Sequence, residues 1–272
     1  MPIMPVTRTR RHVLLSRPGR IGWLVAVAAF ACSSAVLLPP IVQPAAYHAF
    51  ADARVVFGIP NFWNALSNVP FLIVGIAGLH FVLLDPRGRS AFADARERWP
   101  YVVLFAGVAL TGIGSAYYHL APDNARLAWD RLPMTVGFMS IVAAMIVERI
   151  DRTAGLRLLA PLVVLGAASV FWWQASQAWG AENLRPYVTV QFGSIAIVLS
   201  IAALFPSRYN RASDIYAVIA LYAAAKYTEH FDEALFSFGG VLSGHSLKHL
   251  LAAIAAYMIL RMLKLRASTA RT

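Results

Sequence analysis

Long apolar runs, separated by short polar segments, alternate along almost the whole chain. A helix that crosses the hydrocarbon core of a membrane needs about 20 mostly apolar residues. Eight runs approach this length, at 21–38, 61–84, 100–119, 130–148, 157–174, 187–205, 214–230 and 245–263. The gaps between these runs are too short to hold a soluble domain. The pattern therefore predicts an all-α bundle of membrane-spanning helices.

The first run has two interpretations. It follows an arginine-rich stretch and ends in small residues at 31–35, which is also the pattern of a secretory signal. Pro39 and Pro40 end the helix in either case. We favour an uncleaved helix, and cleavage would leave seven helices with the same orientation. The predicted parts are a basic N-terminus with an extra helix at 1–45, a seven-helix membrane domain at 46–263 and a basic tail at 264–272.

The distribution of Lys and Arg predicts how the bundle is oriented. Cytoplasmic loops of membrane proteins carry an excess of these residues. If the N-terminus is inside and eight helices alternate, most of the 24 Lys and Arg residues fall in inside segments. We therefore expect both termini to be cytoplasmic. The compact loops and the Arg-rich inside face indicate a bacterial inner membrane.

Composition agrees with this class and excludes others. The chain is 59% hydrophobic and 14% charged, whereas a soluble domain carries about 25% charged residues. The net charge of +11 does not indicate nucleic acid, because most basic residues lie between apolar runs. The expected partners are the bilayer and a lipid, with no obligate protein partner. The single Cys32 excludes an internal disulfide and a thiolate-rich zinc site.

Three histidines and two further polar residues stand at the edges of apolar runs. They are Ser115, His119, Asp130, His245 and His249. A polar group that faces hydrocarbon costs roughly several kcal/mol unless it is satisfied. His245 and His249 are four residues apart, so a helix presents both on one face, as in many metal sites. On the predicted topology all five residues lie toward the outer side of the membrane, so one shared site is possible.

These residue types suit metal-assisted hydrolysis. Three neutral imidazoles leave a fourth zinc position for water, and the metal would lower the pKa of that water toward about 7. Asp130 would take the proton and return it to a leaving amine. Ser115 would donate a hydrogen bond to the developing oxyanion or orient a ligand. Imidazole also suits other transition metals, so the residues alone leave the metal's identity open.

Further polar residues are candidates for contacts with substrate or with the ligands. Lys226 and Glu229 have the spacing of a helical ion pair, and a substrate head-group site is the alternative. Tyr118 and Lys248 each stand next to one of the histidines.

Three asparagines head the second run. Asn64 and Asn68 share a helix face and would brace the bundle or the site, and Asn61 is a potential helix cap. Two other histidines have simpler interpretations. His80 is expected to hydrogen-bond a neighbouring helix, and His48 to lie at an interface or in solvent.

Three blocks of the sequence resemble the alkaline ceramidase family. This family belongs to a superfamily of seven-helix membrane hydrolases that includes adiponectin-receptor-like and Per1-like proteins. The resemblance covers about residues 50–263. The blocks that carry it are Phe62-Trp63-Asn64 with Ser67-Asn68, Gly114-Ser115 with His119 and Asp130, and Gly244-His245 with His249.

The resemblance implies a zinc-dependent amidase inside the membrane, with one extra N-terminal helix added to the seven-helix hydrolase core. It implies that His119, His245 and His249 bind zinc, and that Asp130 and Ser115 are catalytic. The substrate would be a ceramide-like N-acyl lipid, cleaved to a long-chain base and a free fatty acid. This would be a step of sphingolipid metabolism.

The chain departs from the family in one respect, and two other functions compete. Eukaryotic members have an acidic calcium-binding stretch, for which only Asp52 and Asn61 are weak counterparts here, so no calcium site is expected. One alternative is a receptor-like or structural member of the same superfamily, whose metal site catalyses no reaction. The retained Asp130 and Ser115 argue against it. The other is a proton or divalent-cation transporter, which would need polar residues across the full depth.

Overall fold

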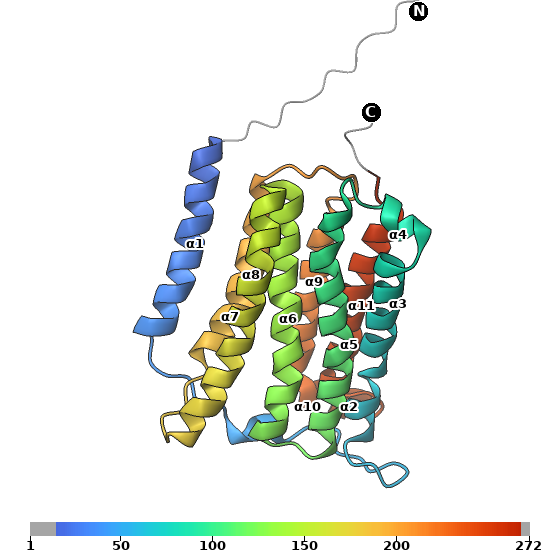
Figure 1. Cartoon of the computed structure of the whole chain (residues 1–272). Helices are drawn as coiled ribbons and strands as arrows, with labels where there is room; N and C mark the ends of the chain where they lie inside the picture. Colours follow the sequence, from blue (N-terminus) through green and yellow to red (C-terminus); the bar gives the residue numbers. More distant parts are fainter. Residues whose placement is uncertain (1–14, 268–272) are drawn as a thin grey trace, which may run out of the picture.

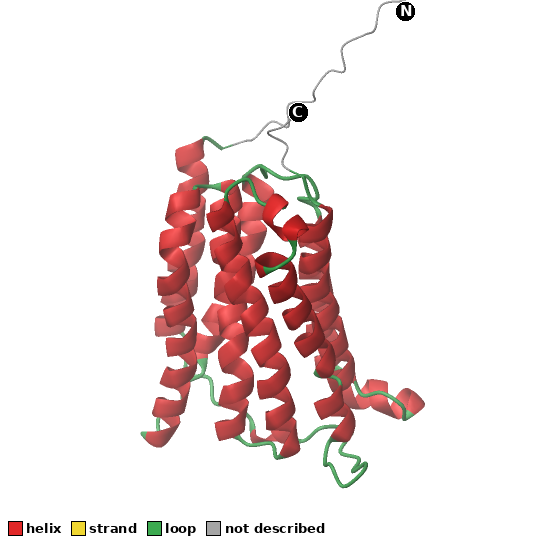
Figure 2. Cartoon of the chain, turned by 45° about the vertical axis from the view of Figure 1, so that its right-hand side comes forward, coloured by secondary structure: helices red, strands yellow, loops and turns green. Residues whose placement is uncertain are grey.

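The computed structural model describes residues 15–267 as a bundle of long, nearly parallel helices (Figures 1 and 2). The start of the predicted basic N-terminus, with His12, and the last residues of the basic tail lie outside this range. The helices are α1 (Arg17–Leu37), α2 (Phe62–Leu66), α3 (Val69–Leu83), α4 (Pro86–Ser90), α5 (Trp99–Leu120), α6 (Asn124–Arg149), α7 (Arg152–Ala178), α8 (Arg185–Leu204), α9 (Asp214–His230), α10 (Asp232–Gly239) and α11 (Gly244–Leu265).

The bundle has the composition of a multi-pass membrane protein. Seven helical stretches of the described chain are long and apolar enough to cross a membrane, with α2 and α3 counted together. The 17-residue α9 also runs within the bundle, packed against α11 (Figure 1). Residues 15–267 contain no β-strand. The prediction of an all-α membrane bundle is therefore confirmed.

The ends of the described chain agree with the predicted path. α1 begins and α11 ends at one end of the bundle, whereas α5 ends and α11 begins at the other (Figure 1). We call this second end, which also holds α2 and α10, the site end. Its assignment to the outer side of the membrane remains a prediction.

Several predicted helices have different bounds in the structure. The run predicted at 21–38 is α1 at Arg17–Leu37, and the run predicted at 157–174 is α7 at Arg152–Ala178. Two further differences lie near the site end. The run at 61–84 is broken between α2 and α3 at Ser67 and Asn68. The run predicted to start at Asp130 starts at Asn124 instead, because the side chain of Asp123 caps the helix by accepting a hydrogen bond from the backbone N–H of Arg126 at 2.6 Å. Asp130 therefore lies inside α6 rather than at its start.

A close approach of α5 and α6 fixes the depth of Asp130. A Cβ atom added at Gly114 would lie 2.1 Å from the backbone oxygen of Trp129. Only glycine allows the two backbones to touch in this way. The contact brings Ser115, which follows Gly114, beside Asp130, which follows Trp129.

The extra helix α1 lies at the edge of the bundle. None of its described residues is buried, and it packs along α8 (Figure 1). Several polar contacts attach it: for example, Trp23 Nε1 donates to Ser200 Oγ at 3.2 Å, and Arg20 Nη1 donates to the Leu204 carbonyl at 3.1 Å. His80 of α3 also departs from expectation, because its side chain is exposed rather than held between helices.

Candidate metal centre

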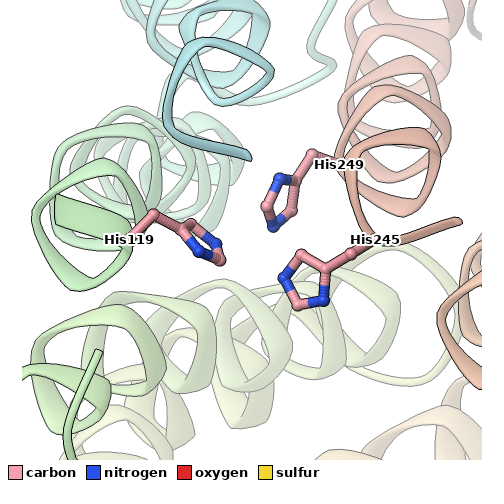
Figure 3. Close-up of side chains that lie close together, drawn as sticks. All are labelled: His119, His245 and His249. Atoms are coloured by element: carbon pink, nitrogen blue, oxygen red, sulfur yellow. The ribbon is translucent and has the colours of Figure 1, made fainter. Parts of the chain in front are cut away.

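Three buried histidines converge at the site end of the bundle. His119 belongs to the last turn of α5, whereas His245 and His249 occupy the first two turns of α11. Each offers a ring nitrogen, and the three nitrogens lie within 4.8 Å of one another. Figure 3 shows the rings facing a common centre. The fold thus joins the two sequence blocks that contain these histidines.

Several of the ring nitrogens have no other partner. Within the described chain, Nδ1 and Nε2 of His119 and Nε2 of His245 are buried without a hydrogen bond. A buried polar atom left unsatisfied costs about 1–3 kcal/mol. Three close imidazoles with nitrogens free of competing bonds fit a metal site, and nitrogen ligands are those that zinc accepts.

The third histidine, His249, is oriented by Ser67 at the break between α2 and α3. His249 Nδ1 lies 2.8 Å from Ser67 Oγ, and the same hydroxyl donates to the Asn64 carbonyl at 3.0 Å. A hydroxyl has only one proton to give. Ser67 therefore accepts from His249 Nδ1–H, which leaves the Nε2 lone pair of His249 free for a metal.

Asn64 and Asn68 brace this region, as the sequence predicted. Asn64 is fully buried, accepts a hydrogen bond from Ser246 Oγ at 2.8 Å and donates to the Asp52 carbonyl at 2.9 Å. Asn68 Nδ2 donates to the Asn64 carbonyl at 2.8 Å. The α2–α3 break is thus tied to the start of α11.

Asn61 plays a different role from the one expected. It has left-handed backbone angles at the start of α2, and its side chain makes no capping hydrogen bond. Its Nδ2 instead donates to the backbone carbonyl of His119 at 2.9 Å. Asp52, the other weak calcium candidate, is buried and forms a two-point ion pair with Arg54. The expectation of no calcium site stays a prediction.

The start of α11 is held by an acidic residue for which the sequence indicated no role of its own beyond its place near Lys226 and Glu229. Asp232, the first residue of α10, accepts a hydrogen bond from the backbone N–H of His245 at 2.7 Å. A carboxylate is stabilised at the positive end of a helix dipole. A signal was present, since Asp232 follows a helix end and precedes the histidine pair, but nothing local indicated its partner.

Ser115 and Asp130 lie together beside the histidines. Both are buried, and the Ser115 hydroxyl hydrogen-bonds to the Asp130 carboxyl group. Both line a cavity of about 280 Å³, and His249 forms another part of its wall. The catalytic candidates and one metal-ligand candidate therefore face the same space.

A second section of cavity, which is apolar, adjoins the first. This section has a volume of about 170 Å³ and is lined mainly by aliphatic and aromatic side chains. Both sections are lined by residues of α8 and α9. They also share the five wall residues Phe71, Thr111, Met134, Tyr222 and Ala252. The space is thus polar beside the histidines and apolar deeper in the bundle.

The predicted Lys226–Glu229 pair is part of a larger cluster. Glu229 Oε2 contacts Lys226 Nζ, and Glu229 Oε1 lies 2.6 Å from Lys248 Nζ. Tyr47 donates its hydroxyl proton to Glu229 Oε1 at 3.1 Å. Burial, followed by the charge of Glu229, raises the pKa of Tyr47 well above its usual range, so this hydroxyl stays a donor. These three charged side chains line the cavity.

Tyr118 lies behind the histidines rather than in the cavity wall. Its ring centroid is 4.9 Å from that of His119, and its hydroxyl lies 2.9 Å from His48 Nδ1. His48, half-buried, also contacts Asn124 Oδ1 at 3.0 Å. Tyr118 therefore supports a ligand candidate and does not reach the cavity.

Comparison with known proteins assigns the family. A family model described as Ceramidase matches residues 54–228, which is more than half of the chain. No curated protein matches the chain. The matched region contains Ser115, His119 and Asp130, and it ends before the two histidines of α11. The chain belongs to the ceramidase family, whose members are hydrolases of amide bonds.

Proposed function

We propose that the protein is a zinc-dependent amidase of the membrane. It cleaves the N-acyl bond of ceramide-like lipids and releases a long-chain base and a free fatty acid. One observation carries this proposal. The Ser115–Asp130 pair and His249 of the three-histidine cluster line the polar end of a cavity whose deeper section is apolar. Such a space accommodates an acyl chain with its amide bond beside the catalytic groups.

His119, His245 and His249 would hold the zinc ion. Bound zinc supplies Lewis-acid chemistry that polarises a carbonyl and activates water. The chain's own contribution begins with ligand orientation. Ser67 fixes the proton of His249 on Nδ1, and Asn61 restrains the backbone of His119. Outer partners of this kind typically change metal affinity or activity by about 10–100-fold.

Asp130 and Ser115 move and hold protons during cleavage. Asp130 takes a proton from the attacking water, whose oxygen bonds to the amide carbon, and passes it to the nitrogen as the C–N bond breaks. Ser115 turns its hydroxyl from Asp130 to the carbonyl oxygen, where negative charge develops. The acyl chain lies in the apolar section of the cavity.

We also propose the setting of this reaction. The site end faces the outer side of a bacterial inner membrane, with both termini in the cytoplasm. This orientation is supported by the excess of Lys and Arg in the segments at the opposite end of the bundle.

A second candidate is a receptor-like or structural protein whose metal site catalyses no reaction. One observation favours it: of the three histidines, only His249 lines the cavity. The transporter alternative has less support. The apolar section, not a chain of ionisable groups, continues from the site toward the opposite end of the bundle.

Metal content and hydrolysis, measured together, test the proposal. We expect purified wild-type protein in detergent to contain near-stoichiometric zinc and to release fatty acid from ceramide. His245→Ala should lose both, because it removes one of three ligands. The matched control is His80→Ala, which changes an exposed histidine of α3. Zinc without turnover of any N-acyl lipid would favour the structural alternative, and folded wild-type protein without metal would contradict the mechanism.

A further inference from the structure

The charges that line the cavity are unbalanced. Three cationic side chains, Arg131, Lys226 and Lys248, form part of its wall. Only two carboxylates, Asp130 and Glu229, stand among the described lining residues. The described lining residues therefore carry a net positive charge, even without the charge of a metal ion. Within the depth of a membrane an uncompensated charge is expensive, and such charges commonly mark a substrate pathway.

The two lysines share a single carboxylate. Lys226 and Lys248 contact opposite oxygens of Glu229. An ammonium group has three N–H donors, and each lysine donates a hydrogen bond only to Glu229 within the described chain. Lys248 also lies 5.9 Å from the centre of the Tyr47 ring. Both ammonium groups therefore keep donors that an anion can use.

The third cation, Arg131, makes no ion pair or hydrogen bond with a carboxylate among residues 15–267, and the charge of the adjacent Asp130 acts on it only from a distance. Arg131 is buried, and its Nη1 makes no hydrogen bond. Its Nη2 donates to the neutral Gln43 Oε1 at 2.5 Å. The rings of Trp173 and Tyr187 lie 4.5 and 4.7 Å from the guanidinium carbon. Aromatic faces stabilise this cation in part, but its positive charge remains beside the cavity.

Charge and apolar surface are separated along the cavity. Lys226, Lys248 and Arg131 line the polar section and are not part of the apolar wall. Ser115 and Asp130 also line the polar section. A lipid with its acyl chain in the apolar section would place its amide near Ser115 and Asp130, and the amine half of the molecule would meet the cations.

We infer that the amine half of the preferred substrate carries an acidic group, a carboxylate, sulfonate or phosphate, that pairs with Lys226 and Lys248. This inference rests on the proposed amidase function and narrows its substrate class. The preferred lipid is an N-acylated amino-acid-like or phosphorylated amine, in preference to a ceramide with a neutral head group.

A matched pair of amides tests the inference in the wild-type protein. N-palmitoylglycine and N-palmitoylethanolamine have the same acyl chain and amide, and differ by a carboxylate in place of a hydroxymethyl group. We expect kcat/KM of the zinc-loaded protein to be about tenfold or more higher for N-palmitoylglycine, in the range of close charge pairs. Equal values would overturn the inference, because cations that served only the released palmitate would treat both substrates alike.

Variants assign the preference to the lysine cluster. Lys226→Met keeps most of the length of the side chain and removes its charge, so the ratio of the two kcat/KM values should fall about tenfold. Lys226→Arg should retain the preference. Lys264→Met removes the same charge from an exposed position near the far end of α11 and should leave the ratio unchanged. A wild-type ratio in Lys226→Met would overturn the assignment.

Ceramide, assayed in parallel, separates this inference from the proposed function. If ceramide is cleaved and the acidic amide is not preferred over its neutral partner, the amidase function stands and the inference fails. If no amide is cleaved by zinc-loaded protein, the proposed function fails, and the inference fails with it.

Discussion

The hydroxyl group of Ser67 sets which ring nitrogen of His249 carries the proton. It donates its only proton to the Asn64 carbonyl, so the ring of His249 must donate to it from Nδ1. The tautomer of His249 thus follows from a hydrogen bond made by a different helix segment. Outer partners of metal ligands act in this way, since they fix both the ring orientation and the position of its lone pair.

We therefore expect Ser67→Ala to weaken metal binding without removing a ligand. The alanine cannot accept the Nδ1 proton, so the ring loses its fixed tautomer and orientation. Zinc affinity, measured by competition with a chelator, should fall about 10–100-fold. Ser33→Ala, at an exposed position of α1, is the control. An unchanged affinity in Ser67→Ala would mean that the contact does not orient His249.

Asp130 and Arg131 are adjacent in sequence and have different surroundings. The carboxyl group of Asp130 meets Ser115, whereas the guanidinium of Arg131 lies between aromatic rings. The sequence places these two opposite charges side by side in one apolar run, and in the structure both residues line the same cavity. The catalytic role of Asp130 remains a proposal that the hydrolysis assays test.

At the scale of elements, the site depends on a junction of α9, α10 and α11. Gly244 begins α11 where its backbone passes against α9, and an added Cβ atom would lie 2.1 Å from the Thr228 carbonyl oxygen. Asp232 of α10 accepts from the His245 N–H at the same junction. The position of the histidine pair is therefore set by two neighbouring helices as well as by α11 itself.

Gly244→Ala should disturb this junction. A methyl group that close to a backbone oxygen forces the start of α11 to shift, at a cost of about 1–3 kcal/mol. We expect a lower unfolding temperature and weaker zinc retention. Gly239→Ala in α10 meets no atom within 4 Å and serves as the control. If both variants unfolded at the wild-type temperature, the tight junction would not contribute to stability.

The elements themselves could be anticipated in large part. The ends of α9 agree with the prediction, and those of α5, α8 and α11 lie close to it. Differences occur where polar side chains act on the backbone. Asp123 extends α6 beyond its apolar run, and the Ser67–Asn68 pair marks the break before α3. Hydropathy measures only how apolar a segment is. It therefore does not predict a hydrogen bond by which a polar side chain caps a helix.

At the scale of the whole molecule, α1 is an addition to the bundle rather than part of its core. It has no buried residue and packs along α8. We expect a chain that starts at residue 39 to insert, fold and retain zinc, with a lower unfolding temperature. Metal content and thermal unfolding of the two forms check this. Loss of zinc from a folded truncated protein would show that α1 supports the site.

The sequence by itself determined the class of the protein and identified candidate groups for its chemistry. Apolar runs predict membrane helices because a bilayer requires a minimum apolar length. Polar residues at the ends of those runs cost free energy in a membrane, and this cost marks them as candidates for a functional site. The blocks around His119 and His245 also carried the resemblance to ceramidases, and a match over residues 54–228, which includes the first of these blocks, confirmed the family.

Only the tertiary structure decided how these groups meet. His119 and His245 lie on α5 and α11, and no local pattern specifies that two helices so distant in sequence share a centre. The cavity, the Ser67 contact and the lysines that share Glu229 likewise join separate helices. Periodicity reports which face of a helix is polar, whereas packing determines which polar faces come together.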